Sequence, residues 1–192
     1  MKKIVFVILA AIMIISCEQK ATVNFKFADQ EQVISCSEND NPLLNEALYS
    51  FENDLYTKYD SVTKSKITVY GRFIYRGMDG SAPYTEIKTP HTTSIVEALA
   101  SENILIKGKE PSAVNYEHPA VQCIVDAIEN DELKVTIKAL IDTKTMNPKL
   151  FNTRFRNFGR NAERQRNLAL FIALEGYYQQ ILNLETPEST TN

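Results

Sequence analysis

The stretch NPLLNEALYSFENDLYTKYDSV, residues 41–62, carries the clearest secondary-structure signal in the chain. It opens with Asn41 and Pro42, a capping residue followed by a proline at the first helical position. Large apolar side chains then recur every three or four residues, which places them on one face of a helix. They are Leu44, Leu48, Phe51, Leu55, Tyr59 and Val62. The stretch therefore predicts a long helix with one side in the core.

Further helices are predicted by similar start signals followed by apolar periodicity. Ser94 with Glu97 fits a capping box, Pro119 opens another segment, and Asn147-Pro148 repeats the first signature before a run to about Leu184. The apolar positions of the intervening candidates are Val96, Leu99 and Ala100, then Ile124, Val125 and Ile128, then Leu133, Ile137, Leu140 and Ile141. Five candidates predict a compact, mainly α domain.

The stretch 66–88 departs from this pattern. It is rich in β-branched and aromatic residues, and Gly77 and Asp79-Gly80 mark a turn within it. We expect a small β-hairpin here, with a continued helix as the alternative. Residues 104–106 are three consecutive apolar residues that would supply a third short strand. An α+β fold is therefore the alternative to the mainly α one.

The composition is that of an ordinary folded domain. The 192 residues include 21 Lys and Arg and 24 Asp and Glu, which gives a formal net charge of -3, and 44% are hydrophobic. This excludes a wholly disordered chain and a strongly basic protein, so no nucleic-acid partner is expected. Only 6 glycines are present, so glycine-rich phosphate loops are scarce.

The N-terminus is organised like a secretory signal. Lys2 and Lys3 precede an unbroken apolar run of 12 residues, Ile4–Ile15. That length suits the core of a signal peptide and falls short of the ~20 residues that span a bilayer. The tetrad Ile14-Ile15-Ser16-Cys17 then resembles the lipobox of bacterial lipoproteins, although Ile is less usual than Leu at its first position.

The lipobox resemblance covers residues 1–20 and concerns the processing of the N-terminus, not the fold. It implies that Cys17 receives a diacylglyceryl group, that residues 1–16 are removed and that the new N-terminus is acylated. Two or more acyl chains anchor a protein stably to a membrane. Because Glu18 stands where the inner-membrane retention signal usually has Asp, the resemblance favours the outer membrane. The alternatives are a plain secretory signal with a chance cysteine, or an uncleaved apolar helix.

The rest of the chain is predicted to divide into a tether, one domain and a tail. Residues 17–36 are expected to form the lipidated tether, although the apolar and polar alternation over 22–27 suits a short strand equally well. A single mainly helical domain is predicted over 37–184. The polar end, 185–192, is expected to be a flexible tail.

Two cysteines remain besides the anchor, Cys36 and Cys123. An oxidising envelope permits a disulfide between them, which would close a long loop and contribute roughly 4–5 kcal/mol. Cys123 also lies in an apolar series typical of a buried helix face, so a buried free thiol is the alternative. No zinc-ligand spacing is present, and neither a metal nor another cofactor is expected.

The segment 144–166 is strongly basic. Arg156, Arg160 and Arg164 recur every four residues and so form one stripe on a helix. Guanidinium groups bind phosphate and carboxylate, which makes the stripe a candidate site for an anionic glycan, a protein partner or an envelope surface. The alternative is a solvated face, or pairing with acidic residues elsewhere in the chain.

A second candidate contact region combines Tyr70, Tyr75 and Tyr84 with nearby arginines. Tyrosine and arginine are common at interfaces, and the alternative is that these tyrosines pack at the edge of the core. Tyr177 and Tyr178, within the apolar C-terminal run, are expected to be packing residues.

The two histidines, His91 and His118, both stand at predicted helix starts. If the two starts meet, these residues and Glu117 form a metal site or a general-base pair. The chain has no HExxH, nucleophile elbow or P-loop motif to support catalysis. We therefore predict a lipid-anchored, non-catalytic binding module, with an envelope hydrolase or metal-dependent enzyme using Glu117, His118 and His91 as the alternative.

Overall fold

The computed structural model describes residues 23–36, 42–108, 113–147, 149–150 and 161–185. These residues form a mainly helical domain, which confirms the predicted fold class. Leu105 and Val114 form an isolated antiparallel bridge, and the described part of the chain contains no β-strand. Within the same residues, no helix combines the length and the apolar character that crossing a bilayer requires.

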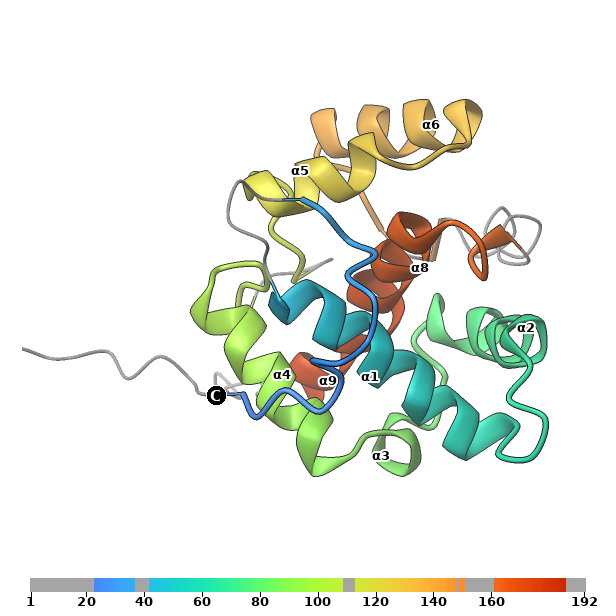
Figure 1. Cartoon of the computed structure of the whole chain (residues 1–192). Helices are drawn as coiled ribbons and strands as arrows, with labels where there is room; N and C mark the ends of the chain where they lie inside the picture. Colours follow the sequence, from blue (N-terminus) through green and yellow to red (C-terminus); the bar gives the residue numbers. More distant parts are fainter. Residues whose placement is uncertain (1–22, 37–41, 109–112, 148, 151–160, 186–192) are drawn as a thin grey trace, which may run out of the picture.

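α1 runs diagonally through the lower part of the domain, and α5 and α6 lie above it (Figure 1). α1 contacts α2, α3, α4 and α8. Along the chain the elements are α1 (Pro42–Tyr59), α2 (Lys66–Gly77), α3 (Tyr84–Ile87), α4 (Pro90–Ser101), α5 (Pro119–Asp126), α6 (Asp131–Asp142), α8 (Arg166–Ala173), the π-helix η2 (Leu174–Tyr178) and α9 (Gln179–Glu185).

α1 begins at Pro42, as the sequence predicts, and supplies the centre of the core. Its predicted apolar face is fully buried at Leu44, Leu48, Phe51 and Leu55. The last predicted position, Val62, lies beyond the end of the helix. Ring centroids of three aromatic residues lie 5.0 to 5.8 Å from that of Phe51, namely those of Tyr70, Phe73 and Tyr177. Aromatic contacts at these distances join α1 to α2 and η2.

The hairpin predicted within 66–88 is wrong, because this stretch contains α2. The Ser65 side chain caps α2 by accepting a hydrogen bond from the Thr68 amide. Val69, Tyr70, Phe73 and Ile74 are buried at helical spacing, and burial of this face outweighs the β-propensity of the side chains.

Two other helix boundaries differ from the prediction. α4 starts at Pro90 with Thr89 and Thr92 forming its capping box, so the box predicted from Ser94 and Glu97 is wrong. The Ser94 hydroxyl instead donates to the carbonyl of Pro90, one turn earlier in the helix. The C-terminal run is interrupted by a turn at 161–165 before α8 begins.

Residues 23–36 contain neither helix nor strand and lie against α1 (Figure 1); they are extended except for a turn closed by the Gln30 amide and the Phe27 carbonyl, and we call them the extended segment. The Asn45 side chain accepts from the amides of Val33 and Ile34 at 2.8 and 3.0 Å and donates to the Ile34 carbonyl at 3.0 Å. Ile34 is buried in the core. Residues 33 and 34 of the predicted tether therefore pack against α1.

Cys36 and Cys123 form a disulfide with their Cα atoms 5.4 Å apart, so the free-thiol alternative is wrong. The bond connects the end of the extended segment to α5 across 87 residues. In the chain-entropy model, closing so long a loop restricts the unfolded chain and stabilises the fold by about 4–5 kcal/mol.

Replacing Cys123 with serine is therefore expected to lower the free energy of unfolding by about 4 kcal/mol. Urea denaturation followed by circular dichroism measures the change. Adding reductant to the unaltered protein should produce a similar loss, and Cys36→Ser should match Cys123→Ser. Equal stability of the oxidised and reduced protein would contradict the assignment.

Candidate functional site

A pocket of about 290 Å³ opens between the extended segment, α1 and the start of α2. Its lining is mostly aromatic, amide and lysine side chains. The lining residues are Phe27, Gln30, Tyr49, Glu52, Asn53, Tyr56, Lys64 and Lys66. We call this the tyrosine–lysine pocket.

The aromatic wall of the pocket comes mainly from the outer side of α1. Tyr49, Asn53 and Tyr56 are spaced by four and three residues and so lie on one face of the helix. Phe27 faces them from the extended segment, with its ring centroid 6.2 Å from that of Tyr49. Tyr49 is fixed further by its hydroxyl, which donates to the Glu31 carbonyl at 2.8 Å. The segment and α1 therefore form the two sides of the pocket.

The floor contains Glu52, a buried carboxylate bonded to residues of two other helices. Arg166 at the start of α8 donates two hydrogen bonds to it, at 2.6 and 2.9 Å. The Tyr70 hydroxyl donates to it at 2.9 Å, and the Lys66 ammonium lies 3.3 Å away. Burial raises the pKa of Glu52, but the hydrogen bonds and charge of Arg166 outweigh it and hold the pKa below its ordinary value of 4.5. Glu52 is therefore ionised at neutral pH.

The charged side chains that line the pocket carry one net positive charge. Lys64 and Lys66 line it together with the single carboxylate of Glu52. Arg166 lies behind Glu52, and the carboxylates of Glu31 and Glu163 act on Tyr49 and Tyr56. Lys64 makes no ion pair with any residue that the structure describes, and it stands at the turn before α2 with a φ of +48°. This lysine is therefore available to a ligand.

Tyr56 offers a second free polar group. Its hydroxyl makes no hydrogen bond within the described segments, and the residue is only half-buried. Burial, together with the charge of Glu52, raises the pKa of this phenol to about 12. The hydroxyl is therefore protonated at neutral pH and can donate a hydrogen bond.

The tyrosine–lysine pocket offers aromatic and polar groups that can contact a ligand non-covalently. Flat aromatic rings contact the apolar faces of sugars or other rings, while a free lysine, a phenol and the amides of Gln30 and Asn53 supply polar contacts. Glu52 is fully engaged by Arg166, Lys66 and Tyr70, which holds it as part of the floor.

A second pocket, of about 370 Å³, lies between α5 and α6. Val121, Val125 and Ile141 provide an apolar floor, and Glu117 is at its edge. The Lys138 ammonium pairs with Asp126 at 2.5 Å on the rim. Its remaining charged lining residues are Glu117, Asp142 and Lys144, so the second pocket has three acidic and two basic residues.

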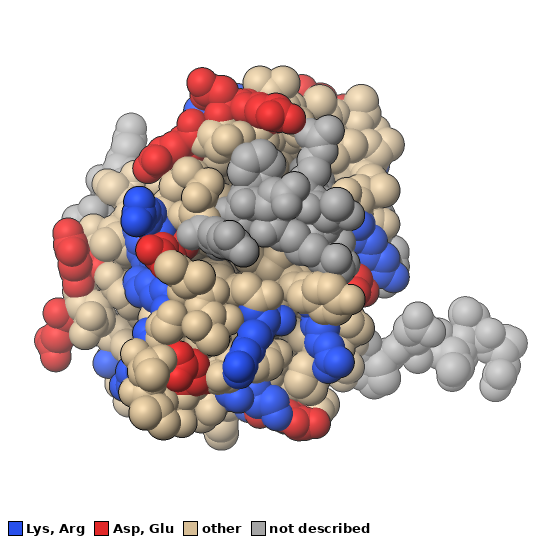
Figure 2. Space-filling model, turned by 90° about the vertical axis from the view of Figure 1, so that its right-hand side faces the viewer, with Lys and Arg blue, Asp and Glu red and all other residues tan. Residues whose placement is uncertain are grey.

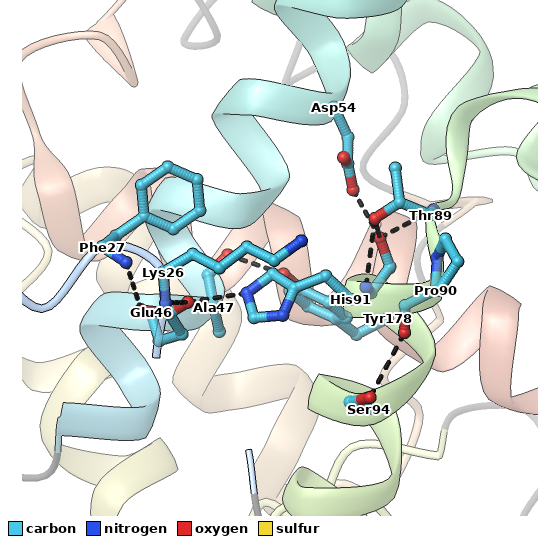
Figure 3. A network of polar contacts seen from close by, with 11 residues as sticks. Lys26, Phe27, Glu46, Ala47, Asp54, Thr89, Pro90, His91, Ser94 and Tyr178 are labelled. Carbon is cyan, nitrogen blue, oxygen red and sulfur yellow. Dashed lines mark hydrogen bonds and ion pairs between the residues drawn. The ribbon is translucent and has the colours of Figure 1, made fainter. Parts of the chain in front are cut away.

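His91 belongs to a buried polar network around α1 (Figure 3). Its Nε2 lies 2.6 Å from a carboxylate oxygen of Glu46, and the same carboxylate accepts from the amides of Lys26 and Phe27 at 2.7 and 3.0 Å. The arrangement connects α4, α1 and the extended segment. His91 therefore pairs with Glu46, a residue that the sequence analysis did not associate with it.

Asp54 is a second buried carboxylate in the same part of α1 (Figure 3). It accepts hydrogen bonds from the hydroxyls of Thr92 and Tyr177, at 2.5 and 2.9 Å. Burial raises the pKa of Asp54 above its ordinary value in spite of these two donors. Like Glu46, it binds α1 to its neighbours.

His118 caps α5, with Nδ1 accepting from the Ala120 amide at 3.2 Å. Neither His118 nor His91 lines the α5–α6 pocket, although Glu117 does. Among the described residues, no group of three His, Cys, Asp or Glu side chains is placed to hold a metal ion. The structure therefore does not bring His91, His118 and Glu117 together as a metal site.

The predicted arginine stripe falls largely on residues that the structure does not describe. Arg156 and Arg160 lie outside the described residues, as does Cys17. Arg164 is exposed, and its Nε lies 3.6 Å from Glu163.

The three tyrosines of the other predicted contact region differ in their exposure to solvent. Tyr70 and Tyr84 are buried, and Tyr75 is exposed on α2. Tyr177 and Tyr178 are fully buried, as packing residues are expected to be. The sequence did not lead us to predict the pocket residues Tyr49, Asn53 and Tyr56, because only the apolar face of their helix was considered. Their spacing of four and three residues would have placed them together on another face of the same helix.

Comparison with protein-family models, with curated proteins and with solved structures finds no match for this chain.

Glu52→Gln is expected to destabilise the protein by about 3 kcal/mol at pH 7, because it leaves the partly buried Arg166 without its charged partner. Since the pKa of Glu52 is lower in the folded than in the unfolded chain, its contribution is present above about pH 4.5 and is lost as pH falls below that value. The variant should therefore lose less stability than the unaltered protein between pH 7 and pH 3.5.

Urea denaturation at the two pH values measures both effects. Glu86→Gln is the matched control, because Glu86 pairs with Lys58 at the exposed surface and should contribute little. If Glu52→Gln is no more destabilising than Glu86→Gln, the contacts of Glu52 with Arg166, Tyr70 and Lys66 do not contribute to stability as expected.

Proposed function

We propose that this protein is a lipid-anchored, non-catalytic binding module of the bacterial cell envelope, and that it binds an anionic glycan in the tyrosine–lysine pocket. The anchor is Cys17, and the lipobox-like tetrad that ends in this residue supports it. The outer membrane is the proposed location, because Glu18 rather than Asp follows the cysteine.

The binding proposal rests on two polar groups that lie without a partner beside the aromatic wall of the pocket. Lys64 and the Tyr56 hydroxyl have no partner among the described residues, and both line the same cavity as Tyr49 and Phe27. Sugar rings pack against aromatic faces, and their carboxylate, sulfate or phosphate groups pair with lysine. An anionic glycan uses both features, whereas a neutral sugar leaves the positive charge unpaired.

The proposal is tested by isothermal titration of the full chain, extracted in detergent, with a heparin-derived hexasaccharide as the anionic probe. Maltohexaose is the neutral probe of equal length. Lys64→Glu should weaken binding of the anionic probe about tenfold, equivalent to 1.4 kcal/mol, because it replaces an attraction with a repulsion. Higher salt should weaken the binding as well.

Lys107→Glu is the matched control, since it makes the same charge change at an exposed residue outside the pocket. It should bind the anionic probe like the unaltered protein. Asn53→Ala should weaken binding without changing the net charge. Equal affinity of both charge variants, or equal affinity for the two probes, would rule out an anionic-glycan site in this pocket.

The anchor is tested separately by replacing Cys17 with alanine in the producing cell. The variant should either stay unprocessed or leave the membrane fraction, because no thiol remains to receive lipid. Membrane fractionation and labelling with a radioactive fatty acid report the two steps. An unchanged membrane fraction together with unchanged labelling would refute the anchor.

A further inference from the structure

The turn between α1 and α2 carries an unusually exposed apolar tip. Val62 is 90% exposed, and Ile67 in the first turn of α2 is 52% exposed. Tyr75, two helical turns further on, is 55% exposed. Ile67 and Tyr75 are eight residues apart and so lie on the same outward side of α2. The turn and this side of α2 therefore form one surface with apolar side chains directed to solvent.

The turn is held in a defined shape. One carboxylate oxygen of Asp60 accepts from the Thr63 amide at 3.0 Å and the other from the Ser65 amide at 3.0 Å. The Thr63 hydroxyl also donates to this carboxylate. These bonds engage the one acidic side chain of the turn and leave Val62 at its convex tip. Its exposure is therefore a property of an ordered turn.

Basic side chains border the apolar ones. Arg72 and Arg76 are exposed on α2 beside Tyr75, and Lys64 follows Val62 in the turn. The Arg72 guanidinium donates to the Tyr59 carbonyl at 2.6 Å, which holds it at the junction of the turn and α2. Figure 2 shows blue Lys and Arg side chains gathered on the side of the molecule where α2 lies.

We propose that the 60–65 turn and the outer side of α2 dock onto an anionic phospholipid bilayer. A convex valine tip inserts into the soft interface between headgroups and acyl chains, whereas a protein partner would have to supply a matching hollow. Arg72 and Arg76 then pair with the phosphates of anionic lipids. The turn shares Lys64 with the tyrosine–lysine pocket, but Val62, Arg72 and Arg76 lie outside that pocket, and membrane docking goes beyond the proposed function.

The absence of tryptophan from the whole sequence gives a clean test. Val62→Trp introduces a single indole at the proposed tip. The full chain is reconstituted into phosphatidylcholine vesicles with brominated acyl chains, with or without phosphatidylglycerol. With the anionic lipid present, the indole emission should shift to shorter wavelength and lose most of its intensity to the bromines.

Val135→Trp is the control, because Val135 is 66% exposed on α6 and should stay in water while the same anchor is present. Arg72→Gln with Arg76→Gln, added to Val62→Trp, should restore most of the emission, and so should high salt. Equal quenching of the Val62→Trp and Val135→Trp proteins would overturn the proposal. Quenching of Val62→Trp that is the same with and without phosphatidylglycerol would also overturn it, because the arginines would then have no anionic partner.

Discussion

The arrangement of the domain depends on four polar side chains of α1 that are buried against several neighbouring segments. Asn45, Glu46, Glu52 and Asp54 are each less than 4% exposed. A buried polar group without a partner costs far more than a hydrogen bond contributes, so each of these side chains needs a partner from another segment. The surrounding elements are therefore positioned by hydrogen bonds as well as by apolar contact.

Each polar residue of α1 selects a different neighbour. Asn45 and Glu46 bind the extended segment, and Glu46 also pairs with His91 of α4. Glu52 joins α2 and α8, while Asp54 joins α4 and η2. Apolar packing alone would allow several arrangements of short helices around α1. The polar contacts distinguish among them, and the tyrosine–lysine pocket forms where two of these partners, the extended segment and the start of α2, leave α1 uncovered.

The sequence predicts those features that depend on neighbouring residues. The helix starts at Pro42 and Pro119 follow from capping chemistry within a few positions, and both are observed. The stretch that contains α2 was misassigned because its aromatic and β-branched side chains favour a strand locally. Its helix is stabilised by contacts with Phe51 and Tyr177, which come from distant parts of the chain. Pairings such as His91 with Glu46, or Phe27 with Tyr49, are set by the fold and leave no local pattern.

The disulfide also determines how the domain carries mechanical load. A pull on the N-terminus first acts on the hydrogen bonds of Glu46 and Asn45 to the extended segment. Beyond them it reaches Cys36, where a covalent bond leads straight to Cys123 in α5. Residues 37–122, including α1 to α4, lie inside the closed loop and are bypassed by the force. The core helices α1 to α4 are therefore shielded from tension that would otherwise unravel them from α1 onward. The extended segment, and with it one side of the tyrosine–lysine pocket, takes the load instead.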